Sequence, residues 1–210
     1  MTGFNAEAIK QQLPNTLTIL RMVLSLAGAV GLWLSYSWSL SWQTPPWLSD
    51  PTAFVRGLAV FAVIAFIVAA ATDWLDGFLA RRWSAETALG RFLDPVADKL
   101  LINGYLLVYA LILDTPLIIL VPVAAMILRD VVITLIRWSS PRGIGEAVRV
   151  SLTAKLKTAF AISVAGLPLL AALLGWQNND LALNIWISAL WIAAALTLLT
   201  GLEYWRRPAS

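Results

Sequence analysis

Residues 73 to 98 read DWLDGFLARRWSAETALGRFLDPVAD and lie between two long apolar runs. The stretch contains four aspartates, three arginines and two glycines. Ionisable side chains beside membrane-length apolar segments are candidates for function by default, because placing them near lipid costs free energy. The stretch therefore predicts two helices joined by a polar connection. The functional site of the protein is expected where these two helices meet.

The composition around this stretch is that of a membrane protein. Of 210 residues, 60% are hydrophobic and only 13% are charged, and the mean hydropathy is +0.78. Several runs approach the roughly 18 to 20 apolar residues that a helix needs to cross a hydrocarbon layer about 30 Å thick. The eleven tryptophans fit this setting, because indole rings gather at membrane interfaces. The expected fold is an all-α integral membrane protein.

The residue types that the chain lacks limit which metal sites and catalytic groups it can form. The chain has neither cysteine nor histidine, which excludes disulfides, thiolate metal sites and the commonest general base. Any metal must be bound by oxygen, and oxygen ligands favour Mg²⁺, Mn²⁺ or Ca²⁺ over zinc. We attribute the net charge of +3 to cytoplasmic loops and contacts with anionic headgroups. The expected partners therefore include membrane lipids and no nucleic acid.

The apolar runs predict six transmembrane helices. The first two are expected at about 15–38 and 53–81, and the third has Pro95 in its first turn and ends near residue 113. The fourth ends near residue 138, and the last two are expected at about 153–174 and 181–204. Proline is tolerated in a first turn because its missing N–H has no helical partner there.

Residues 1–14 are expected to form a juxtamembrane segment ahead of a single transmembrane domain, 15–205. This segment is either a short amphipathic helix on the membrane surface or a frayed terminus. Most basic residues lie near the N-terminus, in the loops 82–91 and 138–157, and in the C-terminal tail. Because basic loops favour the cytoplasmic side, both termini and the motif are expected there.

Helical spacing brings the acidic residues of the opening stretch together. On the second helix, the residues four, seven and eight positions after Asp73 share its face of the helix. They are Gly77, Ala80 and Arg81. Asp76 also turns towards this side, and Asp94 and Asp98 lie one turn apart on the third helix. Because a short connection makes the two helices antiparallel neighbours, all four aspartates are expected to converge.

Four converging carboxylates repel one another unless a counter-charge lies among them. One or two divalent cations would provide it, and two-metal sites are a recurring way to promote displacement at phosphorus. Gly77 and Ala80 would let a nucleotide or pyrophosphate approach the helix, and Arg81 offers a forked donor to phosphate. Gly90 either serves the same approach or is an ordinary loop glycine. The alternative is that each aspartate caps a helix or pairs with a nearby basic residue.

The spacing D-x-x-D-G-x-x-A-R-x8-G-x3-D-x3-D resembles the signature of the CDP-alcohol phosphotransferases. The chain matches all eight fixed positions: Asp73, Asp76, Gly77, Ala80, Arg81, Gly90, Asp94 and Asp98. This is a much more specific signal than a short motif. Most of the chain shares the resemblance, which is closest to bacterial members whose acceptor is glycerol 3-phosphate; the similar segments are PNTLTILR, FLDPVADK, ILRDVVITLIR and TAKLKT.

The resemblance implies a membrane enzyme with divided roles for these residues. Asp73, Asp76 and Asp94 would bind two divalent cations, Mg²⁺ or Mn²⁺, and Asp98 would be the catalytic base and a further candidate ligand. The residues expected at CDP-diacylglycerol are Gly77, Ala80, Arg81 and Gly90, together with Asn15 and Thr18 of the first helix. Asn15 and Thr18 could equally be helix-capping residues.

The resemblance also implies transfer of the phosphatidyl group from CDP-diacylglycerol to glycerol 3-phosphate. The enzyme would be a homodimer in the bacterial inner (cytoplasmic) membrane, a multi-pass protein with its active site facing the cytoplasm. The phosphate of the acceptor needs a separate basic pocket, for which the candidates are Arg129, Arg137, Lys155 and Lys157. Arg129 lies deep in the fourth span, where it must have a partner, so phosphate contact and structural pairing both remain open for it.

Three other functions remain to be distinguished. The same chemistry could use inositol phosphate, or phosphatidylglycerol as in a cardiolipin synthase. A divalent-cation transporter could use the acidic cluster as a pathway, although transporters usually place their carboxylates near the midplane of the bilayer. A structural membrane scaffold would need none of the aspartates for lipid transfer.

Overall fold

The computed structural model describes residues 3–41, 50–83, 88–114, 116–139, 152–176 and 179–206. Near several helix ends, only the helical path is described and not the side chains. These residues form six helices: α1 (Gly3–Ser41), α2 (Pro51–Trp83), α3 (Ala88–Ile112), α4 (Leu117–Ser139), α5 (Leu152–Leu173) and α6 (Asp180–Arg206). Each helix contains a stretch long and apolar enough to cross a membrane, which confirms the expected all-α transmembrane fold.

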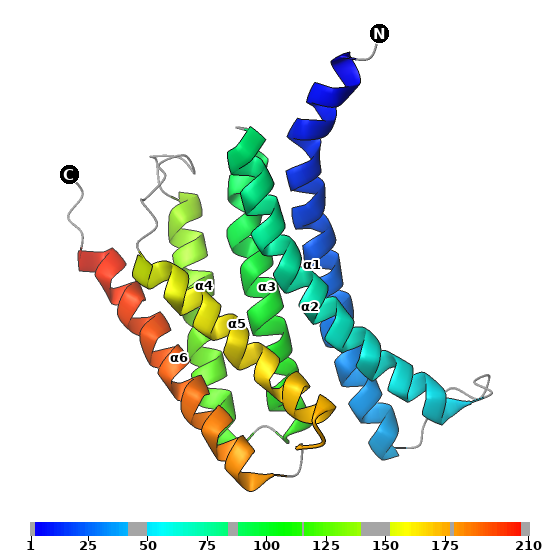
Figure 1. Cartoon of the computed structure of the whole chain (residues 1–210). Coiled ribbons are helices and arrows are strands. Elements are labelled where there is room, and N and C mark those ends of the chain that lie inside the picture. The colour runs from blue at the N-terminus through cyan, green and yellow to red at the C-terminus, as the bar shows by residue number, and fades with distance from the viewer. Residues whose placement is uncertain are drawn as a thin grey trace. The chain divides into compact units, whose positions relative to one another are not determined.

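The chain forms two compact units, 1–108 and 109–210. The first contains α1, α2 and most of α3, and the second contains α4, α5, α6 and the end of α3 (Figure 1). That residues 15–205 form a single domain stays a prediction.

The first helix is longer than its apolar run. It begins at Gly3 and continues without interruption to Ser41, so the expected juxtamembrane segment 1–14 is helical from Gly3 and continuous with the first span. Most residues ahead of the span favour a helix, among them alanine, glutamate, lysine, glutamine and leucine, and α1 continues through Pro14 as well. A helix nucleated within the membrane therefore extends outwards through them.

The third helix also begins earlier than predicted. Because it starts at Ala88, Pro95 lies inside the helix and not in its first turn, and Gly90 lies within the helix and not ahead of it. Both predictions were therefore wrong. Residues 88–94 include alanine, leucine and arginine, which favour a helix, and long membrane helices tolerate the one hydrogen bond that a proline removes.

Asp50 begins α2 as its N-cap. Its carboxylate accepts hydrogen bonds from the backbone N–H of Ala53 (3.0 Å) and from the hydroxyl of Thr52 (2.9 Å). The N–H of Ala53 contributes most to lowering the pKa of Asp50, because it stabilises the charged form. This aspartate therefore has a local structural role at the end of α2 opposite the motif.

In the first unit, α1 turns a polar and small-residue face inwards. Thr18, Arg21 and Ser25 are buried along it, followed by Gly28 and Ala29. The opposite face exposes large apolar side chains at the same helical spacing: Ile19, Val23, Leu26, Val30 and Trp33. This is the reverse of a water-soluble helix and is the pattern expected where lipid surrounds the protein.

Tyr105 joins the three helices of this unit. Its hydroxyl donates a hydrogen bond to the backbone carbonyl of Ala62 on α2 (2.7 Å), and its ring packs edge-on against Phe66. A Cβ atom on Gly28 of α1 would lie 2.1 Å from this hydroxyl. Gly28 is therefore what allows α1 to approach Tyr105 so closely.

In the second unit, two tryptophans of α6 compensate for prolines in neighbouring helices. Pro122 in α4 and Pro168 in α5 lack the N–H groups that would bond to the carbonyls of Ile118 and Val164, four residues earlier. The indole N–H groups donate to these same two carbonyls, from Trp191 to Ile118 and from Trp186 to Val164, both at 2.9 Å. This packing satisfies backbone groups that have no water available in a bilayer.

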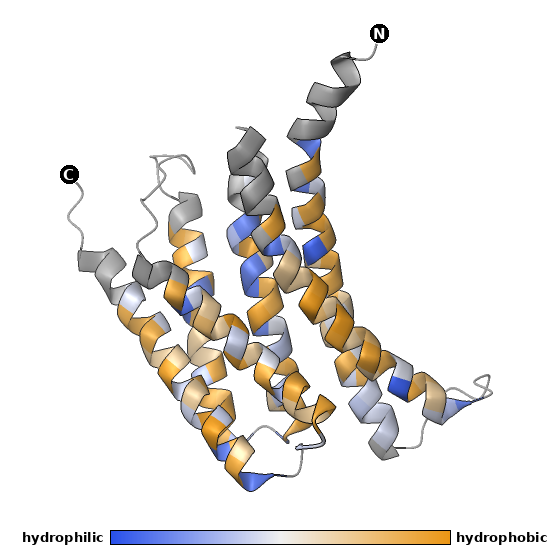
Figure 2. Cartoon of the chain, viewed as in Figure 1, coloured by the Kyte–Doolittle hydropathy of each residue, from blue (hydrophilic) through white to orange (hydrophobic). Residues whose placement is uncertain are grey.

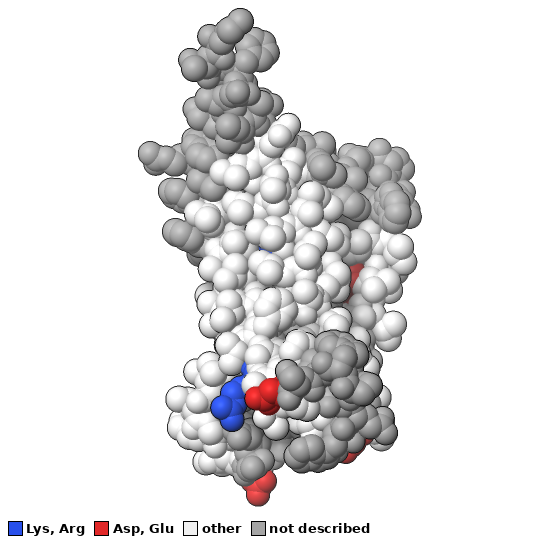
Figure 3. Space-filling model, turned by 90° about the vertical axis from the view of Figure 1, so that its right-hand side faces the viewer, with Lys and Arg blue, Asp and Glu red and all other residues white. Residues whose placement is uncertain are grey.

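The outer surface of the helices is predominantly apolar. Figure 2 shows hydrophobic residues over most of each described helix, with hydrophilic residues concentrated towards the helix ends and on part of α1 and α3. On the face drawn in Figure 3, few of the described residues are charged, and most of those lie towards its lower end. Such a surface is suited to contact with lipid tails.

Candidate active site

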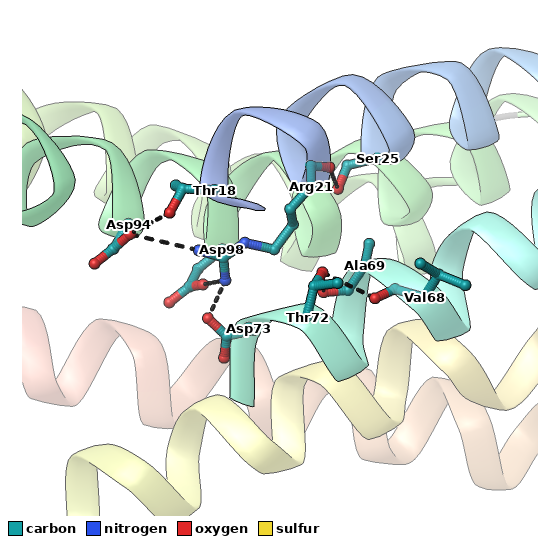
Figure 4. A network of polar contacts seen from close by, with 9 residues as sticks. All are labelled: Thr18, Arg21, Ser25, Val68, Ala69, Thr72, Asp73, Asp94 and Asp98. Carbon is teal, nitrogen blue, oxygen red and sulfur yellow. Dashed lines mark hydrogen bonds and ion pairs between the residues drawn. The ribbon is translucent and has the colours of Figure 1, made fainter. Parts of the chain in front are cut away.

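The centre of the site is the guanidinium of Arg21, which meets three aspartates of the motif (Figure 4). Arg21 lies on the inward face of α1, and its Nη1 donates to Oδ1 of Asp73 at the end of the second span and to Oδ1 of Asp98 on α3, the latter at 2.7 Å. Its Nη2 lies 3.7 Å from Oδ1 of Asp94. Three carboxylates from two helices therefore converge, as helical spacing predicts.

Three hydroxyls lie beside this cluster, and they differ in what they bond to. Thr18, one turn before Arg21, donates to Oδ1 of Asp94 (2.9 Å). The hydroxyl of Ser25 donates to the carbonyl of Arg21 (2.7 Å), and that of Thr72 donates to backbone carbonyls of its own helix. Of these three hydroxyls, Thr18 is thus the one that orients a motif carboxylate.

Burial differs sharply between the cation and the anions. The side chain of Arg21 is 0% exposed, whereas those of Asp73, Asp94 and Asp98 are 33%, 50% and 31% exposed. The guanidinium therefore lies behind the carboxylates, which retain access to solvent or to a ligand. The contacts described here bring three carboxylates to one guanidinium.

This donor set fits a divalent cation that prefers oxygen ligands. Within the described part of the chain, no group of three or more acidic side chains is arranged to hold a metal ion, and Arg21 contacts each of the three carboxylates. The side chain of Asp76, the fourth aspartate of the motif, lies outside the described residues.

The remaining predicted contacts with the nucleotide are described only in part. The side chains of Ala80 and Arg81, and the surroundings of Gly77, lie outside the described residues, although α2 runs through all three positions. Gly90 is buried near the start of α3, and Asn15 is half-buried on α1. Their contact with a nucleotide stays a prediction.

In the second unit, two of the predicted basic residues meet at one hydroxyl. Thr200 of α6 accepts hydrogen bonds from Nζ of Lys157 (3.2 Å) and, at 3.5 Å, from Nη2 of Arg129. Nη1 of Arg129 also pairs with the adjacent Asp130 at 3.0 Å. Structural pairing of Arg129 is thus present, and two cationic side chains meet at one neutral hydroxyl.

A close helix contact limits the space around Arg129. A Cβ atom on Gly201 would lie 3.0 Å from its Nε and 3.3 Å from its Cγ, so the glycine provides room for the side chain of Arg129. The side chains of Arg137 and Lys155, the other two predicted phosphate ligands, lie outside the described residues.

Sequence reasoning assigned no role to Arg21, Thr200 or Gly201. A signal for Arg21 was present, because Thr18, Arg21 and Ser25 recur at helical spacing within an otherwise apolar span, and polar residues there face the interior of a bundle. Thr200 and Gly201 have no comparable signal, since both residue types are common in membrane helices.

Comparison with known proteins matches the chain to a family. The family model described as CDP-alcohol phosphatidyltransferase covers residues 11–199. The chain belongs to the CDP-alcohol phosphatidyltransferase family. The match spans both structural units and includes the eight motif positions. Enzymes of this family generally depend on a divalent metal ion.

Curated relatives extend along nearly the whole chain. A protein of Sodalis glossinidius is 34% identical over 193 residues, and one of Escherichia coli (strain K12) is 36% identical over 197 residues. In both cases the match covers 91% of this chain and 92% of the relative. Each relative is named CDP-diacylglycerol–glycerol-3-phosphate 3-phosphatidyltransferase.

Proposed function

We propose that the protein transfers the phosphatidyl group of CDP-diacylglycerol to glycerol 3-phosphate, which yields phosphatidylglycerophosphate and CMP. The observation that carries the proposal is the convergence of Asp73, Asp94 and Asp98 from two helices on one point. The names of the relatives support the choice of both substrates. The enzyme is accordingly a transferase of phospholipid biosynthesis.

The metal ligands are Asp73, Asp76 and Asp94, with Asp98 as a further candidate. The oxygen-only donor set favours two Mg²⁺ or Mn²⁺ ions. When bound, these ions would neutralise charge on the diphosphate and on the leaving group. The residues assigned to CDP-diacylglycerol are Gly77, Ala80 and Arg81 on α2, Gly90 on α3, and Asn15 and Thr18 on α1.

Asp98 acts as the general base. It takes the proton from the primary hydroxyl of glycerol 3-phosphate, whose oxygen forms a bond to the phosphorus that carries diacylglycerol. The bond between this phosphorus and the bridging oxygen breaks, and CMP leaves with the electron pair. Partial exposure of the Asp98 side chain, 31%, supports its access to a substrate.

The phosphate of the acceptor is bound by basic residues of the second unit. Arg129 and Lys157 are the best supported, because both donate hydrogen bonds to the same hydroxyl, that of Thr200. Thr200 adds a hydroxyl to this set, and Arg137 and Lys155 complete it. A guanidinium and an ammonium together suit a phosphate dianion.

The setting is a bacterial inner membrane. The six apolar helices make the chain a multi-pass membrane protein, and the distribution of basic residues favours an active site that faces the cytoplasm. We assign the working form as a homodimer on the basis of family resemblance.

An assay of the purified protein tests the reaction directly. The protein in detergent is incubated with CDP-diacylglycerol, Mg²⁺ and one alcohol at a time: glycerol 3-phosphate, inositol phosphate or phosphatidylglycerol. CMP release with glycerol 3-phosphate is expected. Release with only one of the other alcohols would change the acceptor and leave the chemistry intact. Cation flux in proteoliposomes, without any CMP release, would instead indicate a transporter.

Asp98→Asn tests the role of the base. The amide keeps the shape of the side chain and loses its basicity, so turnover should be lost while metal-dependent binding of CDP-diacylglycerol is largely retained. Asp50→Asn is a matched control, because asparagine caps a helix as well as aspartate does and Asp50 has no contact with the motif among the interactions described. Complete loss of lipid binding by Asp98→Asn would make Asp98 chiefly a metal ligand.

A further inference from the structure

Arg21 is a charged residue in the interior of the first unit that the proposed reaction does not use. It lies within the first membrane span, and its side chain is fully buried. A guanidinium in this position is costly unless anions surround it. The three anions that surround it are aspartates of the motif on α2 and α3.

When no metal is present, the guanidinium of Arg21 offsets the repulsion between the motif carboxylates. Asp73, Asp94 and Asp98 would otherwise place three like charges close together in a poorly solvated region. Because Arg21 comes from a third helix, its contacts with the carboxylates also hold α1, α2 and α3 together at this level. The motif can thus stay assembled before a divalent cation arrives.

The same contacts place Arg21 in competition with a metal ion. Oδ1 of Asp73 and Oδ1 of Asp98 both accept from Nη1 of Arg21, and carboxylate oxygens are what Mg²⁺ and Mn²⁺ require. The guanidinium engages electron pairs that the ion needs, and its positive charge opposes the approach of a second cation. Each effect weakens metal binding.

We propose that Arg21 is a positioning residue, a built-in counter-ion that holds the motif aspartates together in the metal-free enzyme and lowers their affinity for the divalent cation. The proposal rests on the metal site assigned under the proposed function. Arg21 acts through the aspartates and need not contact the substrates. Its removal therefore has two opposite effects: the metal-free protein becomes less stable, and the metal binds more tightly.

Metal binding by the purified full-length chain in detergent tests this proposal without reference to turnover. Wild type, Arg21→Met and Arg21→Lys are stripped of metal with a chelator and titrated with Mn²⁺, and free Mn²⁺ is followed by electron paramagnetic resonance. Arg21→Met should bind Mn²⁺ at least about tenfold more tightly, because a full positive charge beside the ligands is gone. Arg21→Lys keeps the charge and should stay close to wild type.

Thermal unfolding provides the second measurement. Metal-free Arg21→Met should have a lower Tm than metal-free wild type, and saturating Mn²⁺ should raise its Tm by a larger increment. If Arg21→Met does not fold, Arg21→Gln tests the same loss of charge with a side chain that still forms hydrogen bonds. Ser25→Ala is the control, because Ser25 bonds to the backbone of Arg21 and not to a carboxylate, so its Mn²⁺ affinity should equal that of wild type.

The outcomes distinguish failure of the counter-ion role of Arg21 from failure of the proposed metal site. Equal or weaker Mn²⁺ binding by the neutral Arg21 variants would overturn the counter-ion role while the metal site remains. Equal tightening in Ser25→Ala would also overturn it, because the effect would then come from general loosening of α1. A wild-type protein that binds no Mn²⁺ would overturn the metal site itself, and the role of Arg21 with it.

Discussion

The indole N–H of Trp186 on α6 donates a hydrogen bond to the carbonyl of Val164 on α5, at 2.9 Å. Pro168 leaves that same carbonyl without its partner in the helix, since proline has no N–H. One residue thus supplies what another, on a different helix, has removed. In a bilayer, where water is absent, this contact satisfies a backbone group and fixes how α6 rotates against α5.

Trp186→Phe should destabilise the protein by about 1 kcal/mol, and by up to about 3 kcal/mol if the carbonyl stays unsatisfied. In a Pro168→Ala background the new N–H can bond to Val164, so the cost of Trp186→Phe should become smaller. Reversible unfolding in mixed detergent measures all four members of this double-mutant cycle.

Trp33→Phe is the control for the Trp186 cycle, because Trp33 lies on the exposed face of α1. Its stability should be near that of wild type in either background. Equal costs of Trp186→Phe with and without Pro168 would mean that the hydrogen bond to Val164 is not what stabilises the pair.

Gly28→Ala should destabilise the first unit by about 1 to 3 kcal/mol, because the added methyl group would overlap the hydroxyl of Tyr105. Tyr105→Phe should recover part of this loss by removing the overlapping atom. The recovery is incomplete because the new methyl group would also lie 2.9 Å from Cβ of Ala65. Thermal unfolding measures the effect.

Gly57→Ala is the matched control for Gly28→Ala. Nothing lies within 4 Å of a Cβ atom at Gly57, and alanine favours a helix more than glycine does, so stability should be unchanged or slightly higher. Similar losses at both positions would show that contact with Tyr105 is not the cause.

Gly201→Ala should raise the KM for glycerol 3-phosphate by up to about tenfold, because displacement of a binding group by a fraction of an ångström weakens its contacts. The displaced group is Arg129, whose Nε would lie 3.0 Å from the new methyl group. Steady-state kinetics with each substrate in turn measures the effect, and the KM for CDP-diacylglycerol should be unchanged. A rise in both KM values would place the disturbance outside an acceptor-phosphate site.

Thr18→Val should lower kcat by roughly tenfold, because Asp94 loses the hydroxyl that orients it and one hydrogen bond of about 1 to 1.5 kcal/mol. Thr18→Ser keeps the donor to Oδ1 of Asp94 and should retain most of the activity. The comparison uses initial rates at saturating substrates over a range of Mg²⁺ concentrations. Equal rates for the valine and serine variants would remove Thr18 from this role.

Where the prediction of helix ends from hydropathy was wrong, the reason was the same in each case. Hydropathy marks the part of a helix that lies in lipid, but α1 and α3 continue beyond it through segments in which most residues have high helix propensity. Pro95 was placed in a first turn because a proline is costly inside an isolated helix. In a membrane bundle, neighbouring groups can compensate for that cost, as Trp186 and Trp191 do for two other prolines.

The sequence by itself determined the properties that depend on nearby residues. Six apolar runs gave six membrane helices, and the fixed spacing of the motif put Asp94 and Asp98 on one face of α3, because one helical turn separates them. The same spacing, through family resemblance, indicated the reaction. The six spans and the shared face of Asp94 and Asp98 follow from local composition and spacing, which a short segment contains in full, whereas the reaction rests on the family resemblance.

Only the tertiary structure decided which residues from different helices meet. The sequence reasoning expected metal ions to offset the repulsion between the aspartates, and the fold adds the guanidinium of Arg21, which is 52 positions from Asp73 and 77 from Asp98. Contacts over such separations depend on how each helix rotates and slides against its neighbours. That is set by the packing of small residues such as Gly28 against Tyr105, and no local pattern specifies it.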